Sequence, residues 1–480
     1  MKKLLTLIYS PAGPAEVLKL AFPLILSTSA FTIQLFVDRV FLMWYSGPSM
    51  AAAMFAGMTV FTFYSFFMGT AMYVNTFVAQ YDGADRSSRI GPSIWQGIYF
   101  CVIAGLIMAA CAPAAKTICA WAAHSPQLQE LETTYLKISL LGSMPAILTS
   151  CFSCFYTGRA KTWTVLWVNI GVTIVNLVLD YLWIFGKGGF AAHGIAGAAW
   201  ATVVANSFGT IAFFLLFLQT KYRTRYKTSH WAFDKDLFWR IMRYGIPSGT
   251  QFMLDVVGWV FFLAFVGRIN TLSLTATSMA FQINTLAFLP MVGFATAVST
   301  LVGRYLGADD IHKAAKSTWS AITMTACYMT AVAVLYWTAP SIFMYPFKMQ
   351  ADPAEFAQLA PLVKNLLIFV GFYCLFDSGN LIFSAAVKGA GDTRFVMWAS
   401  VFLSWILLVI PAYILSQIFT GTKALYLIWI CAAAYVCVLA VVFLFRFIGG
   451  KWKSMRVIEP IAPKMAPVAP SPTAGTDEPA

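Results

Sequence analysis

A series of apolar stretches, each of about twenty residues or more, constrains this chain more than any other feature of its sequence. A bilayer core about 30 Å thick takes roughly 20 apolar residues of helix, and runs such as FVMWASVFLSWILLVI lack the alternation of a membrane barrel strand. The content of 60% hydrophobic and 11% charged residues excludes an ordinary water-soluble protein. We therefore predict an all-α polytopic membrane protein with twelve transmembrane helices, at approximately residues 20–45, 51–79, 93–121, 132–157, 164–186, 194–219, 238–266, 275–303, 315–343, 360–387, 394–418 and 424–448.

The lysines and arginines predict the orientation of the chain. They are concentrated at both ends and in the even-numbered loops, including the cluster KYRTRYK at Lys221 to Lys227. By the positive-inside rule both termini should be cytoplasmic, and the net charge of +13 should reflect contact with anionic lipid headgroups rather than with nucleic acid. We expect a multi-pass, monomeric protein of the plasma membrane, the inner membrane of a bacterium. Residues 450–480 are predicted to be a disordered cytoplasmic tail.

The chain contains an internal repeat. GTAMYVNTFVAQYDGADR, starting at Gly69, and GFATAVSTLVGRYLGADD, starting at Gly293, are identical at nine of eighteen positions and lie 224 residues apart. The same offset carries Pro23 onto Pro247. Because six helices per copy is an even number, both copies enter the membrane in the same direction, as in transporters with a substrate site between parallel repeats. The predicted organisation is an N-lobe at 1–219, a cytoplasmic basic linker at 220–237 and a C-lobe at 238–449.

Four aspartates lie inside the predicted helices: Asp38, Asp180, Asp255 and Asp377. A charge at the centre of a transmembrane helix costs roughly 2.5 to 3.5 kcal/mol, so each should be neutralised, paired or exposed to water. Arg39 follows Asp38 directly and could pair with it. Adjacent helical residues point about 100° apart, however, so we expect Arg39 to pair with another group or to extend to an interface.

Polar neighbours at helical spacing place the aspartates on polar stripes. The stripes are Ser27, Gln34 and Asp38; Asn169, Thr173, Asn176 and Asp180; Ser248, Gln251 and Asp255; and Tyr373, Asp377, Asn380 and Ser384, with Thr202, Asn206 and Thr210 on the sixth helix. A single polar residue such as Thr202 or Gln251 is equally well explained by a hydrogen bond between helices. Stripes on four helices instead indicate a wet cavity whose oxygens bind a cation, and Asp180 is best interpreted as a coupling-ion ligand or proton carrier.

These segments resemble the multidrug and toxic compound extrusion (MATE) family of transporters over about residues 15–450. The resemblance is carried by LAFP with LFVDRVF, by the repeated segment that starts at Gly69, by Asn176 with Asp180, and by FDSGNLIFSAAVKGAGDTR around Asp377. It implies two six-helix lobes arranged in a V. It also implies a secondary antiporter that exports organic, cationic and amphipathic compounds in exchange for H⁺ or Na⁺ by alternating access.

The resemblance further implies which residues form the sites. The family's N-lobe cation site, a possible Na⁺ site, falls here on Asp38, Asn176, Asp180 and Thr202. A C-lobe site for cation or substrate falls on Asp255, Gln282, Tyr373 and Asp377, and the proline at which the first helix bends falls on Pro23. Two features depart from the family pattern. Members with the C-lobe site commonly carry Glu where this chain has Asp255, and the eleventh helix, VFLSWILLVIPAYIL, has no counterpart of Asp180.

Two other functions are compatible with many apolar helices. A flippase for lipid-linked saccharides would have a similar fold, but its cavity should carry several cationic residues for a pyrophosphate, whereas the mid-helix charges here are mostly acidic. An intramembrane enzyme is disfavoured because the sequence has no HExxH, no GxSxG with triad partners and no Walker P-loop. We therefore predict no enzymatic activity and no cofactor, an ion gradient as the energy source, and small organic cations and the bilayer as partners.

Overall fold

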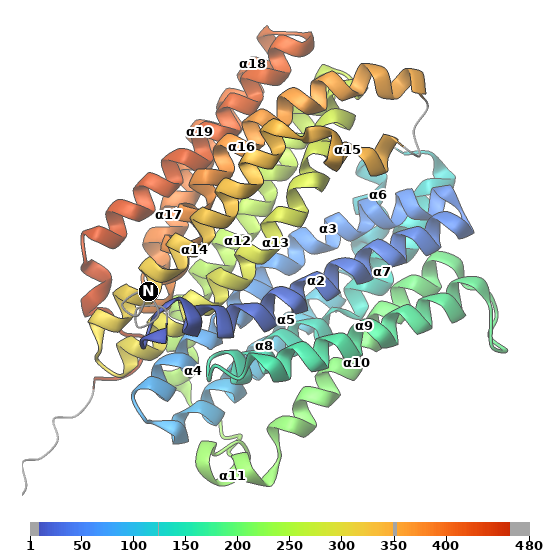
Figure 1. Cartoon of the computed structure of the whole chain (residues 1–480). Helices are drawn as coiled ribbons and strands as arrows, with labels where there is room; N and C mark the ends of the chain where they lie inside the picture. Colours follow the sequence, from blue (N-terminus) through green and yellow to red (C-terminus); the bar gives the residue numbers. More distant parts are fainter. Residues whose placement is uncertain (1–8, 123, 349–352, 461–480) are drawn as a thin grey trace, which may run out of the picture.

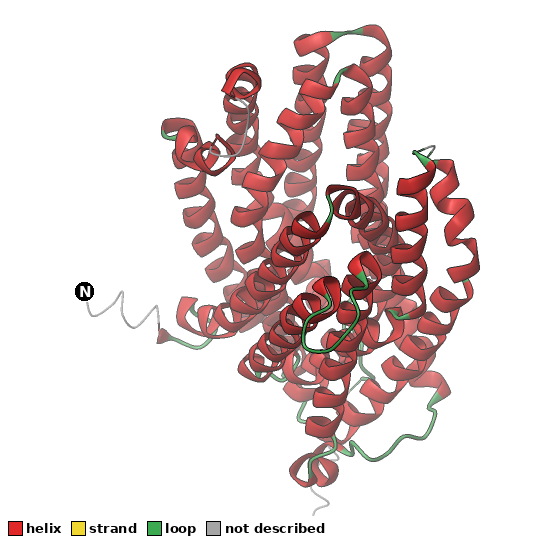
Figure 2. Cartoon of the chain, turned by 90° about the vertical axis from the view of Figure 1, so that its right-hand side faces the viewer, coloured by secondary structure: helices red, strands yellow, loops and turns green. Residues whose placement is uncertain are grey.

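The computed structural model describes residues 9–122, 124–348 and 353–460. Within these ranges the chain forms helices and loops without a strand, as Figure 2 shows. Eleven of the described helices are long and apolar enough to cross a membrane, and a pair of helices bent by 45° makes a twelfth span. The predicted all-α membrane fold of twelve helices is confirmed.

The first six spans match the predicted ones, and several extend beyond them. They are α2 (Pro14–Tyr45), α3 with α4 (Gly47–Met72 and Val74–Gly83), η1 with α5, η2 and α6 (Ser87–Arg89, Ile90–Ala110, Ala112–Ala114 and Ala115–Trp121), α7 with α8 (Pro126–Leu141 and Ser143–Thr157), α9 (Thr162–Phe185) and α10 (Gly194–Phe217). The fourth span, α7 with α8, is the bent pair. Its break falls at Gly142, and Pro145 just beyond lacks the backbone N–H that an unbroken helix would need there.

The last six spans follow the same order. They are α12 (Lys235–Ile269), α13 (Thr271–Gly307), α14 (Ile311–Thr338) with the short α15 (Pro340–Lys348) after it, α16 (Pro353–Ala390), α17 with η3 and α18 (Thr393–Leu403, Ser404–Val409 and Ile410–Ile418) and α19 (Gly421–Ile448). Side-chain caps define where three of these helices begin: Asp234 accepts from the amide of Leu237, Asn270 from that of Ser273, and Asp310 from that of Lys313. Such caps satisfy N–H groups that have no partner within the helix.

The basic connection between the two sets of spans contains a short helix, α11 (Thr220–Tyr226), that the sequence did not lead us to predict. Tyr222 and Tyr226 pack on the ring of Phe155, with ring centroids 5.3 and 5.6 Å apart. The guanidinium of the buried Arg159 lies 3.9 Å from the ring centroid of Tyr226 and 4.3 Å from that of Phe155. Because aromatic faces attract a cation, these contacts hold α11 against the end of α8.

The spans pack as two groups. In the first group α2 packs with α9 and α9 with α10, and in the second group α16 packs with both α13 and α19. Figure 1 shows the first group in blue to green and the second in yellow to red, in contact at one end and diverging towards the other. The division of the chain at 219 and 238 remains a prediction.

The two groups meet near the end of the molecule where the described chain starts and finishes. We call this end the terminal face; it consists of the start of α2, the ends of α4 and α13, the start of α14 and residues 450–460. A Cβ atom at Gly69 would lie 2.9 Å from the Cα of Gly249 in the other group, and one at Gly293 would lie 2.6 Å from the side chain of Ile25. The repeat offset relates these two contacts to each other, so the seam between the groups follows the internal symmetry.

Residues 450–460 differ from the disordered tail that we predicted from the sequence. They include the turn η4 (Lys451–Ser454), and three of their side chains are buried: Trp452, Val457 and Ile458. The amide of Val457 donates to Oε1 of Gln80 at 2.8 Å, and Glu459 pairs with Arg240 at 2.6 Å. The Pro- and Ala-rich composition of the tail concealed these few apolar residues, which pack against the ends of neighbouring helices. Residues 461–480 lie outside the described part of the chain.

Candidate functional site

Asp38 and Asp180 are brought together from two helices of the first group. Asp38 lies on α2 and Asp180 on the neighbouring α9, and only 7% and 0% of their surfaces are exposed. Their carboxylates interact electrostatically, and two like charges in a low dielectric repel each other. Nearer the start of α2, Nδ2 of Asn169 donates to Oγ of Ser27 at 2.6 Å, which fixes the register of the two helices.

Asn176 and Thr202 lie in the same cluster. Asn176, one turn before Asp180, donates through Nδ2 to Oγ1 of Thr202 on α10 at 3.4 Å. Four buried oxygen atoms of the cluster have no hydrogen-bond partner: Oδ1 of Asp38, Oδ1 of Asn176, and Oδ1 and Oδ2 of Asp180. Since buried polar atoms are normally paired, these oxygens are available to a proton or a metal cation. We call Asp38, Asn176, Asp180 and Thr202 the N-half oxygen cluster.

Two further residues face this cluster. Tyr135 of α7 interacts electrostatically with both Asp38 and Asp180. Arg39 is half-buried and interacts electrostatically with Asp38. The sequence analysis missed Tyr135 because its helix, PQLQELETTYLKISLL, carries polar residues on several faces, and no pattern among them singles out this tyrosine.

Asp255 of α12 belongs to a polar cluster in the second group. Gln251, one turn earlier, donates through Nε2 to Oδ2 of Asp255 at 3.0 Å. The ammonium of Lys388 on α16 donates to Oε1 of the same Gln251 at 3.2 Å, and Lys388 interacts electrostatically with Asp255. The sequence analysis did not count Lys388 among the site residues, because a lysine at the end of a span ordinarily extends to the membrane surface.

Asp377 and Tyr373 lie on α16 in this second group. Asp377 is 7% exposed and accepts a hydrogen bond from Nδ2 of Asn380 at 3.1 Å. The hydroxyl of Tyr373 accepts from Nδ2 of Asn284 on α13 at 3.1 Å. The structure does not bring Gln282 into this set, because its side chain is exposed. Asn284, two residues further along α13, is the amide that reaches Tyr373.

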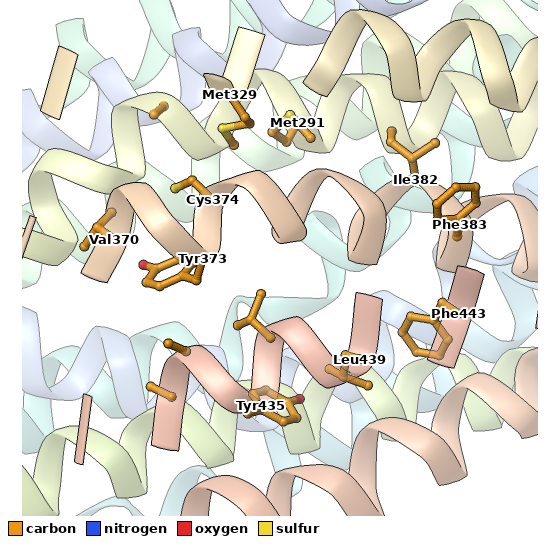
Figure 3. Packing of buried hydrophobic residues seen from close by; sticks show 14 of the residues in the cluster. Met291, Met329, Val370, Tyr373, Cys374, Ile382, Phe383, Tyr435, Leu439 and Phe443 are labelled. Atoms are coloured by element: carbon orange, nitrogen blue, oxygen red, sulfur yellow. The ribbon is translucent and has the colours of Figure 1, made fainter. Parts of the chain in front are cut away.

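Tyr435 of α19 connects the two aspartates of the second group. It interacts with Asp255 and Ser404 through its hydroxyl and electrostatically with Asp377. Figure 3 shows Tyr373 and Tyr435 among the apolar side chains that fill the space around α16 and α19. Ser404 opens η3, a π-helical turn inside the eleventh span, and such turns occur frequently at functional sites. Gln251, Asp255, Tyr373, Asp377, Lys388 and Tyr435 are called the C-half polar cluster.

The two clusters differ in chemistry. The N-half oxygen cluster offers carboxylate, amide and hydroxyl oxygens, the ligands of a proton or a hard cation. In the described part of the chain no three His, Cys, Asp or Glu side chains come together to hold a metal ion. The C-half polar cluster combines two carboxylates with one ammonium, and this excess of negative charge attracts cations.

Comparison with known proteins shows what the chain as a whole is similar to. The chain matches the family model described as MatE over residues 23–182 and 247–414, that is, once in each group of spans. A probable multidrug resistance protein NorM of Thermotoga maritima is 23% identical over 450 residues, which cover 92% of this chain and 94% of that protein. A probable multidrug resistance protein NorM of Brucella suis is 24% identical over 446 residues, with 90% and 92% covered.

Solved structures share the fold. A multidrug resistance MATE family transporter of the MOP superfamily, in an outward-facing conformation, aligns with a TM-score of 0.83 at 18% identity and covers 94% of this chain and 98% of its own. A MOP superfamily transporter from Pyrococcus furiosus aligns with a TM-score of 0.82, also at 18% identity, with 94% and 98% covered.

Proposed function

This chain belongs to the MATE family of multidrug efflux transporters, and on that premise we propose that it is a secondary antiporter that exports organic cations in exchange for H⁺ or Na⁺. The exported compounds would be amphipathic as well as cationic, and alternating access would carry them across the membrane. The two polar clusters have different roles in this proposal. The N-half oxygen cluster takes the coupling ion, and the C-half polar cluster takes the organic cation.

The observation that carries this proposal is the set of unpartnered oxygens around Asp180. Neither Oδ1 nor Oδ2 of Asp180 has a hydrogen-bond donor, although the residue is fully buried. Arg39 compensates part of the charge of Asp38, but the carboxylate of Asp180 still needs a positive charge for neutralisation, and a proton or Na⁺ would supply it. A gradient of that ion then becomes the energy source, because occupation of the cluster depends on the ion's concentration on the side to which the cluster is open.

The C-half polar cluster supports the choice of organic cations as substrate. Asp255 is half-buried and Asp377 is largely buried. Tyr435 of α19 interacts with both aspartates, and Tyr373 of α16 interacts with Asp377. A carboxylate next to aromatic faces attracts an amphipathic cation through both charge and ring contacts. In the alternative of a flippase for lipid-linked saccharides, Asp255 and Asp377 would repel the pyrophosphate.

We further propose that the terminal face is cytoplasmic, in the plasma membrane, because the basic loops and both ends of the described chain lie on that side and the positive-inside rule assigns such segments to the cytoplasm. The conformation described, with the two groups in contact at the terminal face and diverging at the other end, is then open to the outside. The exported compound would leave, and the coupling ion would enter, from this state.

The test is efflux of ethidium, a fluorescent organic cation, from liposomes that contain the purified protein, with a pH gradient and a Na⁺ gradient imposed separately. We expect one of the two gradients to drive efflux, and Asp180→Asn to abolish it. Asp236→Asn is the matched control, because Asp236 is an exposed aspartate in the first turn of α12. Efflux that neither gradient accelerates would contradict the proposal, and transport of a lipid-linked saccharide by the same liposomes would favour the flippase.

A further inference from the structure

Lys388 reaches Asp255 through the amide of Gln251. The ammonium donates to Oε1 at 3.2 Å, and Nε2 of the same amide donates to Oδ2 of Asp255 at 3.0 Å. Both ends of the amide are therefore in use, which fixes its orientation. The ammonium and the carboxylate compensate each other in charge, yet the contact between them is indirect.

The backbone of Lys388 is anchored where the two groups of spans meet. Its carbonyl accepts a hydrogen bond from the hydroxyl of Tyr73, in the first group, at 2.8 Å. The carbonyl of the next residue, Gly389, accepts from Nε2 of Gln80 at 3.0 Å. The Cα of Lys388 is thus fixed, while its flexible four-carbon stem allows the ammonium to take more than one position. A charge on such a tether can leave Asp255 without leaving the protein.

The charges of the C-half polar cluster do not balance. Asp255 and Asp377 both lie beside Tyr435, and within this cluster Lys388 is the single cation. Asp255 is half-buried rather than fully enclosed, so part of this residue remains accessible. A monovalent cation that enters at Asp255 would find the charge of this carboxylate already compensated by the ammonium of Lys388. That ammonium is held in place by an exchangeable hydrogen bond to Gln251.

We propose that Lys388 is a tethered cation that holds the place of the exported organic cation at Asp255, and that the two compete for this carboxylate. The inference rests on the proposed function, since it names the residue that limits affinity in the same site. Lys388 then acts as a specificity-determining residue. It weakens binding of monovalent cations in this conformation and so favours their release, while neutral compounds are unaffected by its charge.

The experiment measures equilibrium binding of ethidium to the purified full-length protein in lipid nanodiscs by fluorescence. Lys388→Met removes the competing charge and keeps most of the side-chain volume, so ethidium affinity should rise about tenfold. Lys388→Arg keeps the charge and should bind ethidium about as the wild type does. Asp255→Asn should weaken binding, and adding Lys388→Met to Asp255→Asn should then have no further effect, because the one carboxylate for which Lys388 and ethidium compete is gone.

A measurement on the wild type avoids any effect of substitution on folding. If ethidium displaces the ammonium, acetic anhydride should modify Lys388 faster in the bound protein, as read by mass spectrometry. Lys313 is the internal control, because it pairs with Asp310 on the terminal face at 2.7 Å, away from this site. Lys388 reactivity that does not change when ethidium binds would overturn the inference.

The outcomes separate this inference from the proposed function. If the wild type binds ethidium and Asp255→Asn weakens binding, but Lys388→Met leaves affinity unchanged or lowers it, then Lys388 is a structural counter-ion and only the inference fails. If the wild type shows no ethidium binding, both the organic-cation substrate and the competition are wrong.

Discussion

Gly83 and Gly307 occupy equivalent positions of the internal repeat, and each packs directly against the backbone of the opposite copy. A Cβ atom at Gly83 would lie 1.8 Å from the carbonyl oxygen of Arg304, and one at Gly307 would lie 2.1 Å from that of Gln80. Gln80 and Arg304 are themselves related by the repeat offset. The contact is therefore reciprocal, and glycine is required at both positions for the ends of α4 and α13 to meet on the terminal face.

The first prediction follows from this contact. Gly83→Ala or Gly307→Ala should separate the two groups at the terminal face, because a backbone carbonyl cannot move aside as a flexible side chain can. The closed seam should lose about 1 to 3 kcal/mol, the usual cost of overpacking. The measurement is the distance distribution between spin labels on cysteines placed at the exposed Ser88 and His312, with the exposed Cys111 and Cys327 changed to Ser.

The expected result is a shift towards longer distances between the two labels. Gly57→Ala is the matched control on α3, because a Cβ there would meet only the side chain of Tyr135, at 4.0 Å. Identical distance distributions for the wild type and Gly307→Ala would show that the seam tolerates the extra atom and that the symmetry of the contact has no role in closure.

The second prediction concerns the N-half oxygen cluster. Asp38→Asn and Asp180→Asn should each abolish gradient-driven efflux and should raise the free energy of unfolding by about 1 kcal/mol or more, because each removes one of two buried charges that repel each other. The double variant should lose no further transport, since the two residues act as one site. Efflux from liposomes and thermal unfolding in detergent are the two measurements. Wild-type efflux from either single variant would remove the cluster from coupling.

The sequence was sufficient to predict the fold because the hydrophobic length of each span and the repeat are local signals. The burial of Asp38 and Asp180 on inward faces could also be predicted from local signals, because a charged residue is conspicuous in an apolar helix and its polar neighbours indicate which face points inward. Tyr135 could not be predicted, because it meets Asp180 only through the packing of α7 against other helices. Lys388 was hidden for a related reason, since its role depends on Gln251, 137 residues earlier in the chain.

Residues 450–460 show a different limit of prediction. The composition of the tail indicates disorder, and composition averages over residues that behave differently. Trp452 is buried because its ring stacks on that of Phe447 of α19, and Val457 because it packs beside Gly391 and donates its amide to Gln80 of α4, so each depends on a surface that other helices present. That surface exists only once the helices have packed together, so the local sequence of the tail does not reveal it.

The third prediction concerns Glu459, the acid that ties this segment to the terminal face. Burial opposes its ionisation, but hydrogen bonds led by that from Arg240 outweigh the burial and lower the pKa of Glu459 from 4.5 to about 2. Since the pKa is lower in the folded protein, the stabilising contribution is complete above about pH 4.5 and is lost as the pH falls towards 2.

Glu459→Gln should therefore lower the free energy of unfolding at pH 7 by roughly 1 kcal/mol, a modest value because the ion pairs are partly exposed and screened. The difference between variant and wild type should shrink below pH 4.5 and disappear near pH 2. Thermal unfolding in detergent across this range is the measurement, with Glu130→Gln as control because Glu130 is exposed on α7. A difference that persists at the same size at pH 2 would mean that the charge of Glu459 is not what holds the segment.

The fourth prediction concerns movement of α2. Pro23 lies inside this helix and is buried, and it removes the backbone hydrogen bond to Lys19. Asp38 lies fifteen residues further on, or about 22 Å along the helix at 1.5 Å per residue, so a bend at Pro23 would move the N-half oxygen cluster as a unit. The hydrogen bond from Asn169 to Ser27 holds α2 one turn beyond the proline and would carry α9 with it.

Pro23→Ala should restore the missing hydrogen bond and favour a straight α2 by up to about 3 kcal/mol. Transport should then slow more than ethidium binding weakens, because the conformational step is affected and the binding residues are not. Turnover in liposomes and equilibrium binding in nanodiscs are compared on the same protein. Pro14→Ala is the matched control, since Pro14 stands in the first turn of α2, where a missing N–H costs nothing. Turnover by Pro23→Ala equal to that of the wild type would exclude bending at this proline from the transport cycle.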